Sequence, residues 1–122
     1  MRIETDESHD LISAEKVDGT KVYSNEGSDM GSVKSVMINK RSGQVEHAVL
    51  SVGGFLGMGS EYHTIPWDKL KYDTSLNGYK LNVTEDQLRS GPTFPETDAS
   101  LLGDREYEER VYSHYGSTPY YA

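Results

Sequence analysis

Residues 44–67 read QVEHAVLSVGGFLGMGSEYHTIPW, and this stretch decides the fold. Its first nine residues alternate between two faces, as a β-strand requires, and the second face becomes steadily more apolar toward Val52. We therefore expect a strand over 44–52 that enters the core at its C-terminal half. The glycine-rich segment Gly53–Gly59 interrupts it, and a second strand is predicted over 62–65. The two faces of the first strand are Val45, His47, Val49 and Ser51, and Glu46, Ala48, Leu50 and Val52.

Further short strands, separated by turn signals, are predicted on both sides of this stretch. No run between Gly19 and Val83 is long enough for a helix that crosses over a parallel sheet. Short helical turns are expected after Pro66 and after Thr84, where Gln87 completes a capping box. Short strands with regular turns are typical of an all-β barrel or sandwich. The additional strands are predicted over 21–23, 31–39, 71–73 and 79–83.

The chain changes character after Pro92, where a linker precedes a predicted helix over 104–115. Tyr107, Val111 and Tyr115 recur at i, i+4 and i+8 and form one narrow apolar stripe. Such a helix is marginal in water by itself. It therefore needs the β domain, a second copy of itself or a partner protein to cover the stripe.

Charge divides the chain into three parts. The net charge of −8 arises from residues 1–10 (−3) and 85–122 (−5), whereas residues 11–84 are balanced. We expect a disordered acidic N-terminus over 1–10, a folded domain over 11–94 with the apolar pair Leu11-Ile12 docked on it, and a linker with an acidic amphipathic helix over 95–122.

The composition narrows the classes of function. Acidic ends argue against nucleic-acid binding, which needs clustered Lys and Arg to neutralise phosphates. The absence of cysteine removes disulfides, thiolate chemistry and cysteine-ligated zinc. The first 25 residues have no apolar stretch typical of a signal peptide, and the longest nearly apolar stretch is too short to span a bilayer. We expect a cytoplasmic protein that does not insert into membranes.

Several motifs together resemble a known family. Gly27-x-x-x-Gly31-x-Val33 leads into one strand, Gly-Gly-Phe-Leu-Gly at 53–57 follows the next, and Pro66-Trp67 comes after the third. This combination resembles the PRC-barrel domain, as in the cytoplasmic barrel of the photosynthetic reaction centre H subunit and the C-terminal domain of RimM-type ribosome maturation factors. The resemblance covers about residues 11–94. It implies a small, closed antiparallel barrel that serves as a docking or assembly module, here as a freestanding bacterial member.

The glycine-rich segment contains the first candidate site. Phe55, Leu56 and Met58 are large apolar side chains in a predicted loop, and they form a contact patch if they point outward. Alternatively, these side chains fold inward and plug the barrel, and the glycines are needed only because a strained turn between the two strands requires positive φ. The spacing of the glycines does not fit a phosphate-binding loop.

The second candidate site is the pair Glu61 and His63, which share a face of one strand. Together with the Gly53–Gly59 loop this pair supports an alternative function, a small-ligand or metal-binding protein. The other interpretation is that His63 and His47 are ordinary surface or rim residues. We expect Trp67 to pack in the core with Tyr62, Leu70 and Tyr72, closing one end of the barrel.

The sequence thus predicts a non-enzymatic protein-interaction module without catalytic residues, metal or cofactor. It is expected to form homo-oligomers or to dock on a larger complex. The predicted partner contacts are Phe55, Leu56, Met58, Tyr107, Val111 and Tyr115.

Overall fold

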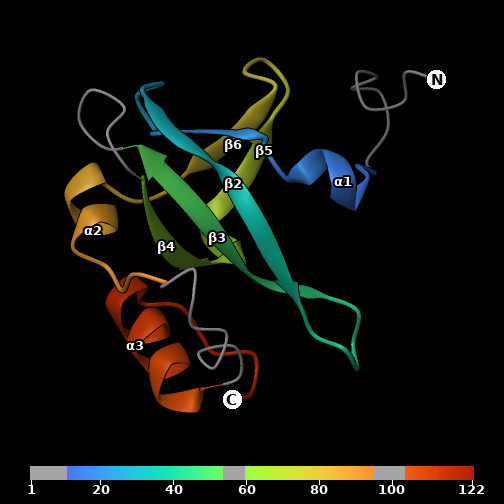
Figure 1. Ribbon diagram of the computed structural model, residues 1–122, viewed down its shortest axis with the longest axis vertical. Coiled ribbons are helices and arrows are strands. Elements are labelled where there is room, and N and C mark those ends of the chain that lie inside the picture. The colour runs from blue at the N-terminus through green and yellow to red at the C-terminus, as the bar shows by residue number, and fades with distance from the viewer. Residues whose placement is uncertain (1–10, 54–59, 95–103) are drawn as a thin grey trace.

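The computed structural model describes residues 11–53, 60–94 and 104–122, and Figure 1 shows how their elements are arranged. Every strand predicted from the sequence is present, with ends shifted by at most two residues. The short helix α1 was not predicted. The elements are α1 (Ala14–Val17), β1 (Lys21–Tyr23), β2 (Asp29–Ile38), β3 (Val45–Gly53), β4 (Ser60–Pro66), the 3-10 turn η3 (Trp67–Lys69), β5 (Leu70–Asp73), β6 (Gly78–Leu81), α2 (Glu85–Arg89) and α3 (Arg105–Tyr115).

Six strands form one curled sheet in the order β4-β3-β2-β1-β6-β5. All neighbouring pairs are antiparallel except β1 and β6, which run parallel. In the described part of the chain no pairing joins the outer strands β4 and β5. The sheet is therefore open and mixed, and the expectation of a closed antiparallel barrel is corrected in both respects. The period of two identifies strands, but it carries no information on their direction, and no hairpin links β1 to β6 to make them antiparallel.

The main core lies on one face of this sheet. The predicted inner face of β3, Ala48, Leu50 and Val52, is fully buried there, so this prediction is confirmed. Leu88 of α2 closes the same core. Register shifts between β2 and β3 mark bulges, which bend the sheet around these side chains. The other fully buried core residues of the sheet include Val22, Val33, Ile65 and Leu81.

Gly31 allows two strands to approach closely. Its φ is +125°, a region that other residues rarely adopt, and a methyl group there would overlap the carbonyl oxygen of Ser51. Only glycine satisfies both conditions. The second glycine of the Gly27-x-x-x-Gly31 motif therefore lets β2 and β3 approach closely without strain.

The helix α3 packs against β4, below the sheet in Figure 1, and its Tyr112 is hydrogen-bonded to His47 on the face of β3 opposite the main core. Tyr107, Val111 and Tyr115 belong to the same buried cluster as the sheet, with exposed fractions of 4%, 0% and 3%. Of the three possible covers for the stripe, the structure uses the protein's own β domain. The helix begins where the Asp104 side chain accepts a hydrogen bond from the backbone N–H of Tyr107, and it ends at Gly116 in a left-handed conformation.

Two expectations at the edges of the domain have different outcomes. Leu11 is 83% exposed and Ile12 37%, so the expected docking of this pair is wrong; α1 buries only Val17. Trp67 packs against the core as predicted, and its ring lies edge-on to Tyr79 with 5.3 Å between centroids. The predicted companion Tyr72 also contacts Tyr79, at the same centroid distance.

Candidate functional site

The predicted contact residues of the loop, Phe55, Leu56 and Met58, lie outside the described residues. The strands on either side of them are described: β3 and β4 pair continuously up to Gly53 opposite Ser60. Residues 54–59 therefore connect the two strands of a hairpin.

The predicted contact residues of the tail have a different role from the one expected. Tyr107, Val111 and Tyr115 pack on the sheet of their own chain, so in this arrangement they are not exposed to a partner. The physical reason is that β3 and β4, on the face opposite the main core, offer the apolar cover that the stripe requires. The partner-contact role expected for these three side chains is corrected accordingly.

Glu61 and His63 are brought together, as their spacing predicts. His63 Nε2 lies 3.3 Å from Glu61 Oε2, and the ring is fully buried while the carboxylate is exposed. His63 Nδ1 has no hydrogen-bond partner within the described part of the chain. Among the same residues no group of three His, Cys, Asp or Glu side chains could hold a metal ion. The expectation of surface or rim histidines is wrong for both His63 and His47, which are buried.

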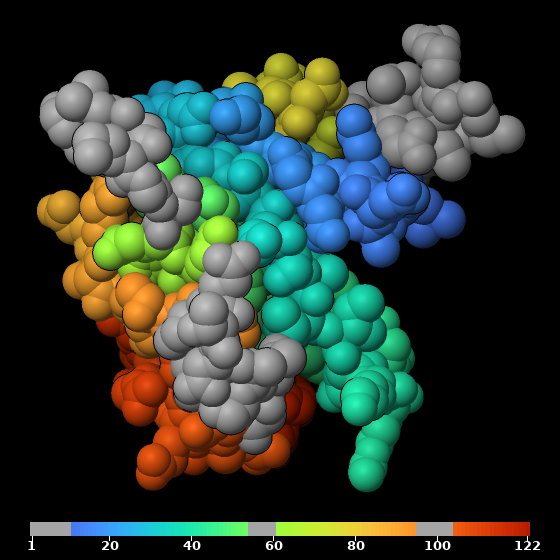
Figure 2. All heavy atoms as spheres, in the orientation of Figure 1, coloured from blue at the N-terminus to red at the C-terminus, as the bar shows by residue number. Residues whose placement is uncertain are grey.

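A groove of about 500 Å³ lies between the sheet and the C-terminal segment. Figure 2 shows the tip of the β2–β3 hairpin projecting from the body of the molecule. Ile38 and Lys40 belong to the more exposed lining of the groove. We call this space the α3 groove. Tyr120 is also exposed, and the less exposed lining includes Met37, His47, Val49, Phe94 and Glu108.

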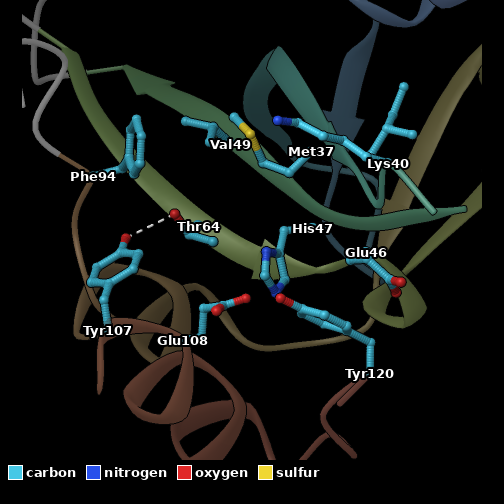
Figure 3. Close-up of a pocket in the computed structure, with 11 residues that line it drawn as sticks. Met37, Lys40, Glu46, His47, Val49, Thr64, Phe94, Tyr107, Glu108 and Tyr120 are labelled. Carbon is cyan, nitrogen blue, oxygen red and sulfur yellow. Dashed lines mark hydrogen bonds between the residues drawn. The ribbon is translucent and has the colours of Figure 1, made fainter. Parts of the chain in front are cut away.

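His47 is the central polar group of the α3 groove (Figure 3). Its Nε2 and the hydroxyl of Tyr112 are hydrogen-bonded at 2.7 Å, and the ring of Tyr120 lies edge-on at 6.0 Å between centroids. Burial lowers the pKa of His47, while the negative charges of Glu108 and Glu46 partly oppose this shift. The lowered pKa favours a neutral imidazole at neutral pH.

Glu108 lies beside His47 and is only 6% exposed. Within the described residues its Oε1 accepts no hydrogen bond, and the Nε of Arg105 lies 3.5 Å away. That distance exceeds the roughly 2.7–2.9 Å of a strong charge-assisted hydrogen bond. The guanidinium of Arg105 instead lies over the ring of Tyr121, 3.7 Å from its centroid. A buried carboxylate oxygen thus retains unused capacity to accept a hydrogen bond.

Tyr107 fixes one end of the groove. Its hydroxyl donates to the carbonyl oxygen of Thr93 at 2.8 Å and lies 2.7 Å from Thr64 Oγ1, as Figure 3 shows for the latter contact. The ring also packs against Phe94, with 6.2 Å between centroids. These contacts join α3 to β4 and to the segment after α2.

The family of the chain follows from a comparison with protein-family models, in which the PRC-barrel domain matches residues 9–88. The chain belongs to the PRC-barrel domain family. A comparison with curated proteins found no match. The PRC-barrel match ends within α2, so the sheet that forms the floor of the α3 groove lies inside it and α3 lies outside. No helix in the described ranges is long and apolar enough to cross a membrane.

The residues that form the α3 groove were not identified from the sequence. His47, Glu108, Tyr112 and Tyr120 were not predicted as a site. One signal was available: His47 and Val49 share the strand face opposite the predicted core, and Glu108 and Tyr112 are one turn apart on the helix. Matching the two faces would have required knowing that this helix covers this strand.

Proposed function

We propose that this PRC-barrel chain is a non-enzymatic interaction module that self-associates or docks on a larger complex through Phe55, Leu56 and Met58. PRC-barrel domains are modules of the protein-interaction type, which supports the general class. One observation supports the location: the β3–β4 hairpin pairs up to Gly53 and Ser60, so these three apolar side chains lie in the connection of a hairpin.

The fate of the tail helix narrows the proposal to this segment. Two apolar surfaces were candidates, the loop and the stripe of Tyr107, Val111 and Tyr115. The stripe is buried in the protein's own core. Large apolar side chains in a loop that connects two strands are a typical interaction surface when they project from the domain.

The double substitution Phe55→Asp with Met58→Asp tests the proposal. We expect a folded protein whose association, measured by light scattering and by pull-down from its native cells, is lost. The double substitution Leu11→Asp with Ile12→Asp is a matched control, because it places the same charges on exposed apolar residues elsewhere.

Three results would contradict the proposal. An unfolded Phe55 and Met58 variant would show that these side chains belong to the core. Association that survives in this variant would place the contact elsewhere. Association that is lost only in the control would move the contact to Leu11 and Ile12.

A further inference from the structure

The α3 groove has the dimensions and lining of a small-molecule site. Its volume of about 500 Å³ lies within the roughly 300–1,000 Å³ of typical ligand pockets. Met37, Val49 and Phe94 supply apolar walls, and Glu108 and His47 are the polar groups at its inner side (Figure 3). An apolar lining with a few convergent polar groups is the usual composition of such sites.

The groove contains a hydrogen-bond acceptor without a donor. Glu108 Oε1 is buried and accepts no hydrogen bond among the described residues, although the carboxylate costs free energy to desolvate. The Tyr120 side chain is hydrogen-bonded to the Glu108 carboxylate, whereas Arg105 stacks on Tyr121 at 3.7 Å and approaches Oε1 only to 3.5 Å. A ligand that brings a donor into the groove would satisfy this oxygen.

The groove is lined by charges of both signs, with the carboxylates of Glu46 and Glu108 and with the ammonium of Lys40 on its more exposed lining. Burial disfavours the charged form of His47, Tyr112 and Tyr120, while the negative charges of Glu108 and Glu46 favour the protonated form of each and Arg105 opposes them at Tyr120. The two carboxylates therefore attract a positive charge at the inner side of the groove, and this attraction must offset the cost of desolvating that charge. The tyrosine rings add cation–π attraction to the same charge.

We propose that the α3 groove binds a small organic cation, an ammonium group on an apolar body. The ammonium donates to Glu108 Oε1, and the body packs against Met37, Val49 and Phe94. A charged donor suits this acceptor better than a neutral one, because a charge-assisted hydrogen bond is about twice as strong. The two proposals rest on different residues, so either proposal can fail without the other.

Titration of the isotope-labelled full chain with 3-phenylpropylammonium tests the proposal. We expect saturable chemical-shift changes at Val49, Thr64 and Tyr107, which line the groove. The neutral alcohol 3-phenylpropanol has nearly the same shape and should bind at least about tenfold more weakly. Equal affinity for the amine and the alcohol, or shifts confined to other surfaces, would overturn the proposal.

Two variants locate the charge and the cavity. Glu108→Gln should weaken binding of the amine by about tenfold to a hundredfold, the effect expected for losing a hydrogen bond to a charged group. Glu109→Gln makes the same change at an exposed position of α3 and should have no effect. Met37→Trp fills the groove from a partly exposed position and should abolish binding even if Glu108→Gln fails to fold. Undiminished binding in Met37→Trp would refute the site.

Discussion

The docking of α3 on its own sheet can be tested with two substitutions that make the same chemical change. Tyr107→Phe and Tyr115→Phe each remove one hydroxyl from a buried ring of the helix. The Tyr107 hydroxyl is hydrogen-bonded to Thr93 and Thr64, at 2.8 and 2.7 Å. The Tyr115 hydroxyl is buried and has no hydrogen-bond partner among the described residues.

The expected magnitudes follow from these partners. Removing the Tyr107 hydroxyl leaves Thr64 Oγ1 without a hydrogen-bond partner among the described residues, and Thr64 is only 3% exposed. A lost hydrogen bond together with an unsatisfied buried group costs about 2 kcal/mol of the free energy of unfolding. Removing the Tyr115 hydroxyl deletes a polar atom that makes no hydrogen bond. We therefore expect a change within about 0.5 kcal/mol of zero, or a slight gain in stability.

Urea unfolding at pH 7 measures both effects. Trp67 fluorescence reports on the sheet and far-UV circular dichroism on the whole chain, so coincident transitions support the use of a single free energy. Equal losses in the two variants would refute the reasoning, because the hydrogen bonds of Tyr107 would then contribute nothing. A Tyr107→Phe variant as stable as the parent would show that α3 does not dock as described.

Three further predictions concern stability. Gly31→Ala should cost about 2 kcal/mol or more in urea unfolding, because the methyl group overlaps Ser51 and the backbone is strained; a loss below about 0.5 kcal/mol would contradict this. Burial lowers the pKa of His47, so the unfolded chain takes up its proton first and stability falls as the pH drops through about 6.5. His47→Gln should reduce that loss of stability between pH 7 and 5. The same change of the free energy of unfolding with pH in this variant and in the parent would contradict the prediction. Burial raises the pKa of Tyr115 to about 12, so the unfolded chain loses its proton first and stability falls as the pH rises from about 10 toward 12. Tyr115→Phe should lose less stability over that window, as thermal unfolding can measure.

The strands were predictable because the pleat imposes a period of two on the sequence. The alternation over 44–52 correctly placed Ala48, Leu50 and Val52 in the core. The turns were predictable for the same kind of local reason: Thr84 accepts a hydrogen bond from the backbone N–H of Gln87, as the capping box implies.

The features that failed are those that depend on distant parts of the chain. Strand direction was wrong for one pair because β1 and β6 meet through tertiary packing, without a turn that fixes their orientation. The exposure of Leu11 and Ile12 was missed because an apolar pair indicates burial only if a complementary surface lies within reach. Composition alone contains no information on that surface.

The α3 groove could not be predicted because its two walls come from segments far apart in the sequence. His47 is on β3 and Glu108 on α3, and each looks unremarkable in its own segment. The face of β3 opposite the core gave one indication in the sequence, since Val49 on that face is apolar. A strand that carries apolar side chains on both faces requires a covering element on each face.

This arrangement couples the stability of α3 to the proposed ligand site. The family match ends at Leu88, so the sheet contributes the floor of the groove and the helix beyond the match contributes the wall with Glu108. The hydrogen bonds of Tyr107 hold that wall in place, and Tyr107→Phe should therefore weaken amine binding as well as folding. Tyr115→Phe leaves these contacts intact and should preserve affinity. If Tyr107→Phe lowers stability but leaves affinity unchanged, the carboxylate is positioned by the rest of the helix and not by this contact.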